Sequence, residues 1–176
     1  MPRSPLLGVL TGAPLVWCSA CSPALDWREV RPEGSALLVM FPCKPTSQAR
    51  SAALAGAQTR MSLYSCSAAG MTFALAFADL GDPARVTPAL TEMRTALAAN
   101  LGSQNARSLP FEVKGMTPNP QAVQLTLQGQ LPDETPTQER AALFAHGTHV
   151  YQAVVLGPKV ADSAAALFFE GLRLPA

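Results

Sequence analysis

The sequence is poor in charge, and the charges that it has are scattered. Only 14% of the 176 residues are charged, and thirteen Lys and Arg against twelve Asp and Glu leave a net charge of +1. Proteins that bind nucleic acids or anionic membranes usually concentrate basic residues, so this distribution argues against both functions. Hydrophobic residues make up 48%, and the chain is long enough for one domain with a real core.

The sequence also lacks the common catalytic signatures. It contains no Gly-x-Ser-x-Gly, no Walker-type loop and no Gly-x-Gly-x-x-Gly, so a nucleophile elbow and nucleotide cradles have no support. Asp79 and Asp82 could form a carboxylate pair, but Asp82 is expected to cap a helix, and a single acid is not an acid–base pair. We therefore expect a protein that is not an enzyme and that has no cofactor.

The first 20 residues are typical of an export signal. Arg3 follows the amino terminus, residues 5–17 are mostly apolar, and the small residues Ser19 and Ala20 come just before Cys21. This order is similar to a bacterial lipobox, in which Cys21 would be lipidated and become the mature amino terminus. The expected organisation is an export signal over 1–20, a lipidated or flexible tether over 21–25 and one domain over 26–176.

Cys18 leaves two alternatives to lipidation open. It stands where a lipobox usually has Leu, so a signal that is simply cleaved, giving a soluble periplasmic protein, is one alternative. The other is an uncleaved anchor over residues 5–24, a stretch near spanning length but weakened by Gly and Pro. Cys18 and Cys21 also have the C-x-x-C spacing of a redox motif, but no strand precedes them and cleavage would separate them.

The two cysteines of the expected mature domain, Cys43 and Cys66, predict a disulfide. Two remaining thiols in an oxidising compartment tend to pair. If a hairpin turns at Gly56-Ala57, Cys66 lies opposite Ser47 and close enough to Cys43 for a bridge. Such a bridge would stabilise the fold by roughly 3 kcal/mol on the chain-entropy model. The alternative is two buried, unpaired thiols.

The hydrophobic pattern predicts many short strands. Residues 71–79 alternate large apolar side chains with threonine and alanine, which indicates a central strand covered on both faces. Short turns between neighbouring strands imply mostly antiparallel pairing. The expected strands cover 26–31, 36–41, 47–55, 58–67, 71–79, 109–113, 122–127, 140–146 and 149–156.

Two helices are expected to pack on this sheet. Asp82 is a strong N-cap before Pro83, apolar residues then recur at intervals of three and four, and Gly102 is placed to end the helix, so we expect a helix over 83–101. A second, alanine-rich helix is expected from a cap at Asp162 to a stop at Gly171. The predicted fold class is α+β: a single-domain α/β/α sandwich with a mostly antiparallel sheet of about six to eight strands.

Four side chains are candidates for interactions. His146 and His149, the only two histidines, flank Gly147-Thr148, so in a hairpin they face each other, close enough to share a metal ion. A metal site needs three or four ligands and no acid or thiol lies nearby in sequence, so we expect a solvated hairpin tip and no metal. Trp27 and Tyr151 have amphipathic rings that serve either interfaces or the core.

The order of elements and three stretches carry a family resemblance. The stretches are 39–42 (Val-Met-Phe-Pro) with Pro45, 147–151 (Gly-Thr-His-Val-Tyr) leading to 155–158 (Val-Leu-Gly-Pro), and 166–174 (Ala-Leu-Phe-Phe-Glu-Gly-Leu-Arg-Leu). The last is similar to a Phe-Phe-x-Ser-Phe-Arg-Leu tail, with glycine in place of serine. The chain thus resembles the PsbP/Mog1-like α/β/α sandwich, seen also in uncharacterised proteobacterial lipoproteins and periplasmic proteins. The resemblance implies a binding or assembly accessory and carries over no active-site residues.

These observations lead to two expectations of different classes. The first is a non-catalytic accessory lipoprotein that faces the periplasm, is held at a bacterial membrane, preferably the outer one, and binds a protein partner or envelope component. The second is a periplasmic small-ligand binder or hydrolase with a pocket between helix 83–101 and the sheet. A deep pocket that converges on His146, His149 or Tyr151 would favour the second. A purely structural role is a third alternative.

Overall fold

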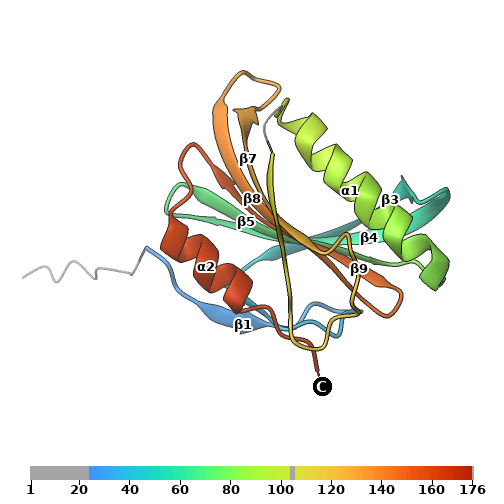
Figure 1. The fold of residues 1–176 in the computed structure, drawn as a ribbon. Helices are drawn as coiled ribbons and strands as arrows, with labels where there is room; N and C mark the ends of the chain where they lie inside the picture. The colour runs from blue at the N-terminus through green and yellow to red at the C-terminus, as the bar shows by residue number, and fades with distance from the viewer. Residues whose placement is uncertain (1–23, 104–105, 176) are drawn as a thin grey trace, which may run out of the picture.

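A seven-stranded antiparallel sheet with a helix on each face forms the body of the protein (Figure 1). The computed structural model describes residues 24–103 and 106–175. In the order β3-β4-β5-β9-β8-β7-β6 every neighbouring pair is antiparallel, and β1 and β2 form a separate two-stranded sheet. The expected α+β class and single domain are confirmed. The strands are β1 (Arg28–Val30), β2 (Val39–Phe41), β3 (Thr46–Leu54), β4 (Ala57–Ala68), β5 (Met71–Asp79), β6 (Arg107–Pro110), β7 (Val123–Gln130), β8 (Pro136–His146) and β9 (His149–Gly157).

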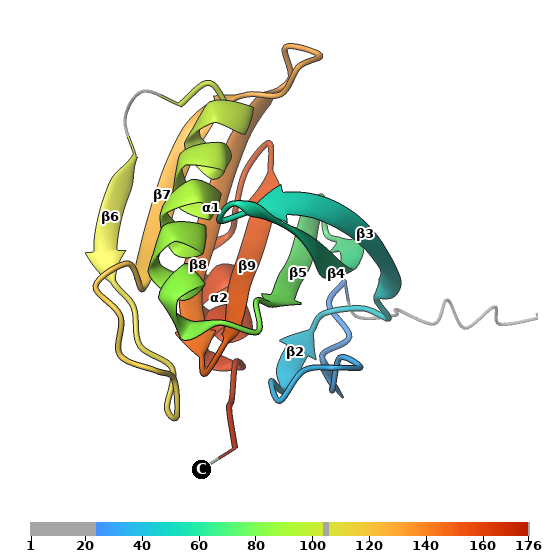
Figure 2. The same cartoon turned by 90° about the vertical axis from the view of Figure 1, so that its right-hand side faces the viewer.

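The sheet separates two hydrophobic cores. On one face α1 (Val86–Asn100) lies across β8 and β9, and β3 and β4 lie to one side of it (Figure 2). On the other face α2 (Asp162–Glu170) and the small β1–β2 sheet cover the aromatic side chains. The side chains of β5 alternate between the two cores: Phe73 and Leu75 are fully buried in the core covered by α2, and Ala78 lies in the core covered by α1. The expected central strand is confirmed.

The hairpin between β3 and β4 turns one residue earlier than expected. The turn residues are Ala55 and Gly56, with φ of 50° and 77°. A two-residue type I′ turn needs positive φ at both central positions, and glycine at the second position meets that need better than Ala57 would. The register of β3 against β4 therefore differs by two residues from the prediction, and Ser47 pairs with Tyr64 and not with Cys66.

The disulfide between Cys43 and Cys66 is confirmed. The Cα atoms of the two residues are 6.0 Å apart, within the range that a bridge requires. Thr46 at the start of β3 pairs with Ser65 of β4, so Cys66 lies one residue beyond the last β4 residue that pairs with β3. It is therefore beside the segment that leads into β3, which contains Cys43. The two cysteines are close enough for a disulfide although the register of the hairpin differs from the expected one.

Helix boundaries agree with the sequence at three of four ends. The Oδ1 atom of Asp82 accepts from the Ala84 amide at 2.9 Å and caps the short helix η1 (Pro83–Arg85), which runs into α1. Gly102, with φ of 58°, follows the end of α1, and Gly171 caps the end of α2. The expected cap at Asp162 is wrong: it is the first helical residue, and its carboxylate pairs with Arg140 on β8.

The first two expected strands are shorter than predicted and do not join the main sheet. β1 and β2 pair with each other, and Leu38 bridges to Arg173 after α2. Their apolar residues instead cover the α2 core, where Leu37, Val39 and Phe41 are fully buried. These strands therefore form a lid on one face of the sheet.

Candidate functional site

A groove of about 540 Å³ lies where β3, β4 and β5 extend beyond the cover of α2. Ser47 and Ala49 of β3 and Ser62 of β4 line it with small side chains. Ala49 pairs with Ser62, so both side chains point to the same face of the sheet. A floor of such small residues leaves a hollow where larger side chains would have filled the space. We call it the β3–β5 groove.

One wall of the β3–β5 groove is the loop between β1 and β2. The Glu33 amide donates to the Tyr64 hydroxyl at 3.0 Å, and the Ser35 hydroxyl donates to the Tyr151 hydroxyl at 3.4 Å. Tyr64 stacks on Phe77 with ring centroids 6.2 Å apart. These contacts hold the loop against the aromatic side chains of β4, β5 and β9.

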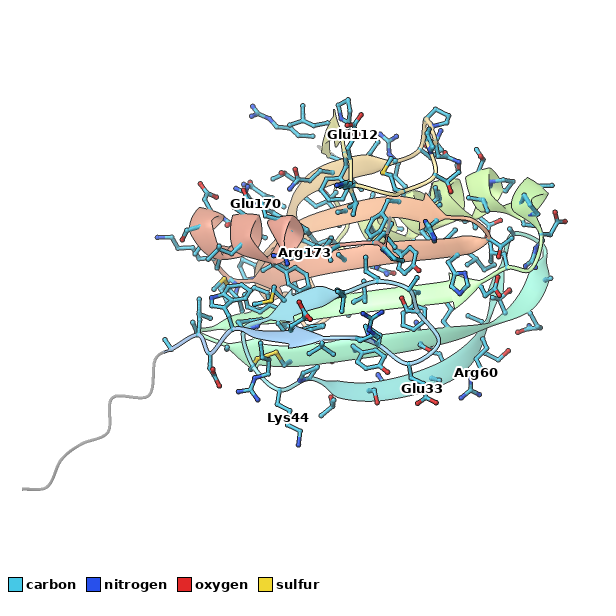
Figure 3. All side chains as sticks on the ribbon, turned by 90° about the horizontal axis from the view of Figure 1, so that it is seen from below. Glu33, Lys44, Arg60, Glu112, Glu170 and Arg173 are labelled. Atoms are coloured by element: carbon cyan, nitrogen blue, oxygen red, sulfur yellow. A yellow bond between two sulfur atoms is a disulfide. The ribbon has the colours of Figure 1, made fainter. Side chains whose placement is uncertain are left out.

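Arg60 supplies the positive charge of the groove. It is an exposed residue of β4, and none of the ion pairs in the described part of the chain involves it. Figure 3 shows the Arg60 and Glu33 side chains extending away from the ribbon on the same side of the molecule. The guanidinium is therefore available to a carboxylate or a carbonyl group of a partner.

Asp79 supplies a fixed negative charge at the end of β5. Its Oδ1 atom accepts from the Thr148 hydroxyl at 2.5 Å and from the Gly81 amide at 3.0 Å. These two hydrogen bonds, that from Thr148 first, lower the pKa of the Asp79 carboxyl below its usual value. The groove thus carries a cationic and an anionic group on neighbouring strands.

The two histidines lie side by side at the β8–β9 turn, as expected. His146 pairs with His149, and the His146 Nδ1 atom is 2.8 Å from the Gly115 carbonyl oxygen. The sequence named Asp79 only as a possible partner of Asp82 and did not place it beside the histidines; its Oδ1 atom is 3.9 Å from His149 Nδ1. No local signal could have revealed it, because β5 and β9 are far apart in sequence and meet only in the sheet. Within 24–103 and 106–175, no group of three or more His, Cys, Asp or Glu is arranged to hold a metal ion.

Of the two candidate aromatic residues, Tyr151 belongs to the core. Its side chain is fully buried and stacks on Phe144 with centroids 5.0 Å apart, and burial raises the pKa of its hydroxyl. The core alternative therefore holds for Tyr151. Trp27 is half-buried and meets Phe73 edge-on at 6.0 Å.

Glu139 is a buried acid that the sequence reasoning also missed. It is 6% exposed, and its Oε1 atom has no hydrogen-bond partner. It pairs with Leu127 on one side and Leu156 on the other, so its carboxyl lies in the apolar core under α1, and burial raises its pKa to about 7. The alternation of side chains along β8 could have indicated this burial, because Glu139 points to the same face of the sheet as the buried residues Ala141 and Leu143.

The space directly under α1 is a filled core. Leu90, Met93 and Leu97 are buried against the sheet. A groove of about 500 Å³ lies along the flank of the helix, lined by Ala98 and by Leu127 of β7 among others. The lining of this groove includes none of His146, His149 and Tyr151, the residues at which a deep pocket would have favoured a small-ligand binder or hydrolase.

The remaining expectations concern the amino-terminal stretch and the membrane. Cys21 and the export signal lie outside the described residues. In the part of the chain that the structure describes, no helix is both long and apolar enough to span a membrane. A scan of known protein families finds no model that matches this chain, and a search of curated proteins finds no match either.

Proposed function

We propose that the protein is a non-catalytic accessory domain of the bacterial cell envelope that binds a partner protein in the β3–β5 groove. It is held at the membrane from the periplasmic side through a lipid on Cys21; a soluble periplasmic form is the alternative. The observation that carries the proposal is the groove itself, with an exposed Arg60 outside the ion pairs of the described chain and a floor of small side chains.

The chemistry of the groove supports a polypeptide as the ligand. Arg60 and the Asp79 carboxylate offer a donor and an acceptor, and Tyr64 with Phe77 offers an aromatic wall. A peptide presents both kinds of polar group along its backbone, together with side chains that can lie on an apolar wall. The volume of about 540 Å³ is enough for more than one side chain.

Two further observations support the envelope as the location. The disulfide between Cys43 and Cys66 is typical of proteins in oxidising compartments. The second is the PsbP/Mog1-like resemblance of the sequence, a fold seen also in uncharacterised proteobacterial lipoproteins and periplasmic proteins, and it favours an accessory role over a catalytic one.

Site-specific photocrosslinking in cells tests the groove. A photoreactive residue is placed at Ser62 on the groove floor, and a matched one at Lys159, on the loop before α2. We expect a defined crosslinked partner from position 62 that disappears when Arg60→Glu is added and persists with Arg107→Glu on β6. Equal crosslinking from both positions, or crosslinks insensitive to Arg60→Glu, would count against the groove.

Labelling of cells with palmitate tests the lipid anchor separately. We expect incorporation into the full-length protein and its loss in Cys21→Ser, with release of the protein to the soluble periplasmic fraction. A soluble wild-type protein whose mature form begins elsewhere would support the cleaved alternative.

The groove beside α1 supports the alternative function, a small-ligand binder. Leu125 and Leu127 line it together with Ala98 and the threonines Thr91 and Thr95, so it suits an apolar ligand. Fluorescence of 1-anilinonaphthalene-8-sulfonate tests it. Binding that Ala98→Trp abolishes would favour this function, and binding of equal strength in that variant would place the dye elsewhere.

A further inference from the structure

We propose that the outer edge of β3 accepts an extended, acidic segment of the partner protein as an additional strand of the sheet. This inference rests on the proposed function, because it names the form in which the partner of the β3–β5 groove would also bind the edge strand that borders the groove. The edge of β3, the composition of the hairpin and the contacts at its turn each support it.

The edge of β3 has free hydrogen-bonding groups in a known register. β3 is the last strand of the sheet and pairs with β4. In a hairpin with the two-residue turn Ala55-Gly56, the flanking residues Leu54 and Ala57 are hydrogen-bonded to each other through their backbones, and every second pair along β3 and β4 is hydrogen-bonded in the same way. The turn at Ala69-Gly70 is also a two-residue turn, and it requires the even-numbered residues of β4 to bond to β5, which agrees with this register. The residues of β3 that direct their N–H and C=O groups outward are therefore Ser47, Ala49, Ser51 and Ala53.

β3 has little protection from pairing at this edge, since Arg50 is its one charged residue. Natural edge strands are usually kept short, or carry charged side chains (most often lysine), proline or a bulge. At the opposite edge, β6 has this protection, since it spans four residues and ends in Pro110. β3 spans nine residues (Thr-Ser-Gln-Ala-Arg-Ser-Ala-Ala-Leu) without proline or lysine, and its pairing with β4 is unbroken from Thr46 to Leu54. The contrast marks the β3 edge as one that is kept open.

The charge of the hairpin identifies the occupant. Residues 46–68 contain Arg50 and Arg60 and no Asp or Glu. Arg50 pairs with Met61 and Arg60 pairs with Ser51, so one arginine points to each face of the sheet, and neither takes part in the ion pairs of the described chain. An added strand with acidic side chains meets Arg50 on one face and, on the other, Arg60, which shares the groove with Glu33 and Asp79. A second copy would bring two cationic hairpins together, which like-charge repulsion disfavours.

The edge is also fixed in position before any partner arrives. Arg85 donates to the Leu54 and Ala55 carbonyls at 2.7 and 3.2 Å. The Glu92 carboxylate accepts from the Ala55 amide at 2.8 Å. Both backbone groups of Ala55 are therefore held by the η1–α1 segment. A preorganised edge loses little entropy when a strand adds to it.

Binding of synthetic peptides tests the proposal. The probe is a labelled nine-residue peptide, Thr-Glu-Val-Glu-Val-Glu-Val-Glu-Thr with blocked ends, titrated with the mature protein by fluorescence anisotropy. We expect saturable binding. Three control peptides separate the contribution of charge from that of backbone pairing. One has Lys in place of each Glu and tests charge. The other two are N-methylated, one at the odd-numbered amides and one at the even-numbered amides, and test backbone pairing. The Lys peptide and the N-methylated peptide blocked on its pairing side should each bind at least about tenfold more weakly.

Variants of the protein identify the edge that binds. Arg50→Glu should weaken binding of the acidic peptide about tenfold, and Arg107→Glu on β6 should leave it unchanged. Ala49→Pro removes an outward N–H group and blocks addition of a strand, while an edge strand tolerates proline at such a position. It should abolish peptide binding, and its circular dichroism shows whether it folds; if it does not, Ala49 N-methylated by semisynthesis replaces it.

Three outcomes would overturn the inference. Binding that neither N-methylated peptide weakens excludes backbone pairing. A Lys peptide that binds as well as the Glu peptide excludes the charge argument. Dimerisation in sedimentation experiments that Ala49→Pro abolishes would assign the edge to a second copy. If crosslinking from position 62 persists while peptide binding fails, the groove still binds a partner and strand addition alone is wrong.

Discussion

At the scale of single residues, Glu139 is an acidic side chain in an apolar environment. Its carboxyl is buried between leucines on a central strand, and no charged group or hydrogen bond contributes to the shift of its pKa to about 7. A carboxylate in such a place is costly, so in the folded protein Glu139 stays protonated until the pH approaches 7. The residue therefore links the stability of the fold to pH.

We expect the free energy of unfolding to fall as the pH rises. The folded-state pKa of Glu139, about 7, lies above its usual 4.5, so the stabilisation is fully present below pH 4.5 and is lost as the pH passes through 7. The loss amounts to about 3 kcal/mol. Urea unfolding between pH 4 and pH 8 measures it.

Two variants separate Glu139 from the other acids. Glu139→Gln should remove this part of the pH dependence, since an amide does not titrate. Glu112→Gln, at an exposed position, should leave the pH dependence as it is in the wild type. An unchanged slope in Glu139→Gln would mean that another group is responsible.

Arg85 is the second residue with a large expected effect. Its guanidinium donates to the carbonyls of Leu54, Ala55 and Leu80 and to the Thr59 hydroxyl. In Arg85→Met these acceptors lose a charged donor, so the free energy of unfolding should fall by about 2 to 3 kcal/mol. Hydrogen exchange should also become faster at the β3–β4 turn.

Arg94→Met is the matched control for Arg85, because Arg94 is on α1, which continues directly from η1, and forms none of the ion pairs of the described chain. It should cost well under about 1 kcal/mol. Equal destabilisation by both variants would indicate that loss of charge, rather than loss of the carbonyl contacts, sets the effect.

At the scale of elements, the end of α1 is seated on β7 at a glycine. The Gln130 amide donates to the Leu101 carbonyl oxygen at 3.0 Å, and a Cβ atom on Gly129 would meet that same oxygen at 1.9 Å. Because the obstacle is backbone, it cannot move aside without displacing the helix. The close approach therefore sets how deeply α1 packs on the sheet.

We expect Gly129→Ala to destabilise the protein by about 2 kcal/mol or more, since the helix must shift to admit the methyl group. Thermal unfolding of the variant measures the effect. Gln128→Ala, at the exposed neighbouring position, should leave the melting temperature nearly unchanged. A Gly129→Ala variant as stable as the wild type would show that α1 tolerates a shifted position.

At the scale of the whole molecule, one disulfide connects the lid to the sheet. The bridge from Cys43 to Cys66 spans 23 residues and joins the segment after β2 to β4. On the chain-entropy model it stabilises the fold by about 3 kcal/mol. The Cys43→Ser/Cys66→Ser double variant should lose that amount in denaturant unfolding.

Reduction provides an independent check of the same value. Dithiothreitol should lower the stability of the wild type to that of the double variant and should leave the double variant unchanged. A double variant that matches the oxidised wild type would mean that the lid is held by its apolar contacts alone.

Much of the fold could be predicted because some patterns are local. The alternation in 71–79 needs only neighbouring residues to indicate a strand with two covered faces, and Asp82 and Gly102 mark the ends of a helix by short-range hydrogen bonds and backbone geometry. The pairing of Cys43 with Cys66 followed from their number and spacing, and it tolerated an error of two residues in register.

Other features depend on contacts between segments far apart in the chain. Asp79 lies beside His149 because β5 pairs with β9, and the burial of Tyr151 and Glu139 depends on what covers each face of the sheet. Residue types and spacing alone thus determined the class of fold, the cross-link and most element positions. Tertiary structure decided strand order, the β3–β5 groove and the open edge, because strand neighbours and covering layers are selected by long-range packing that no short stretch of sequence contains.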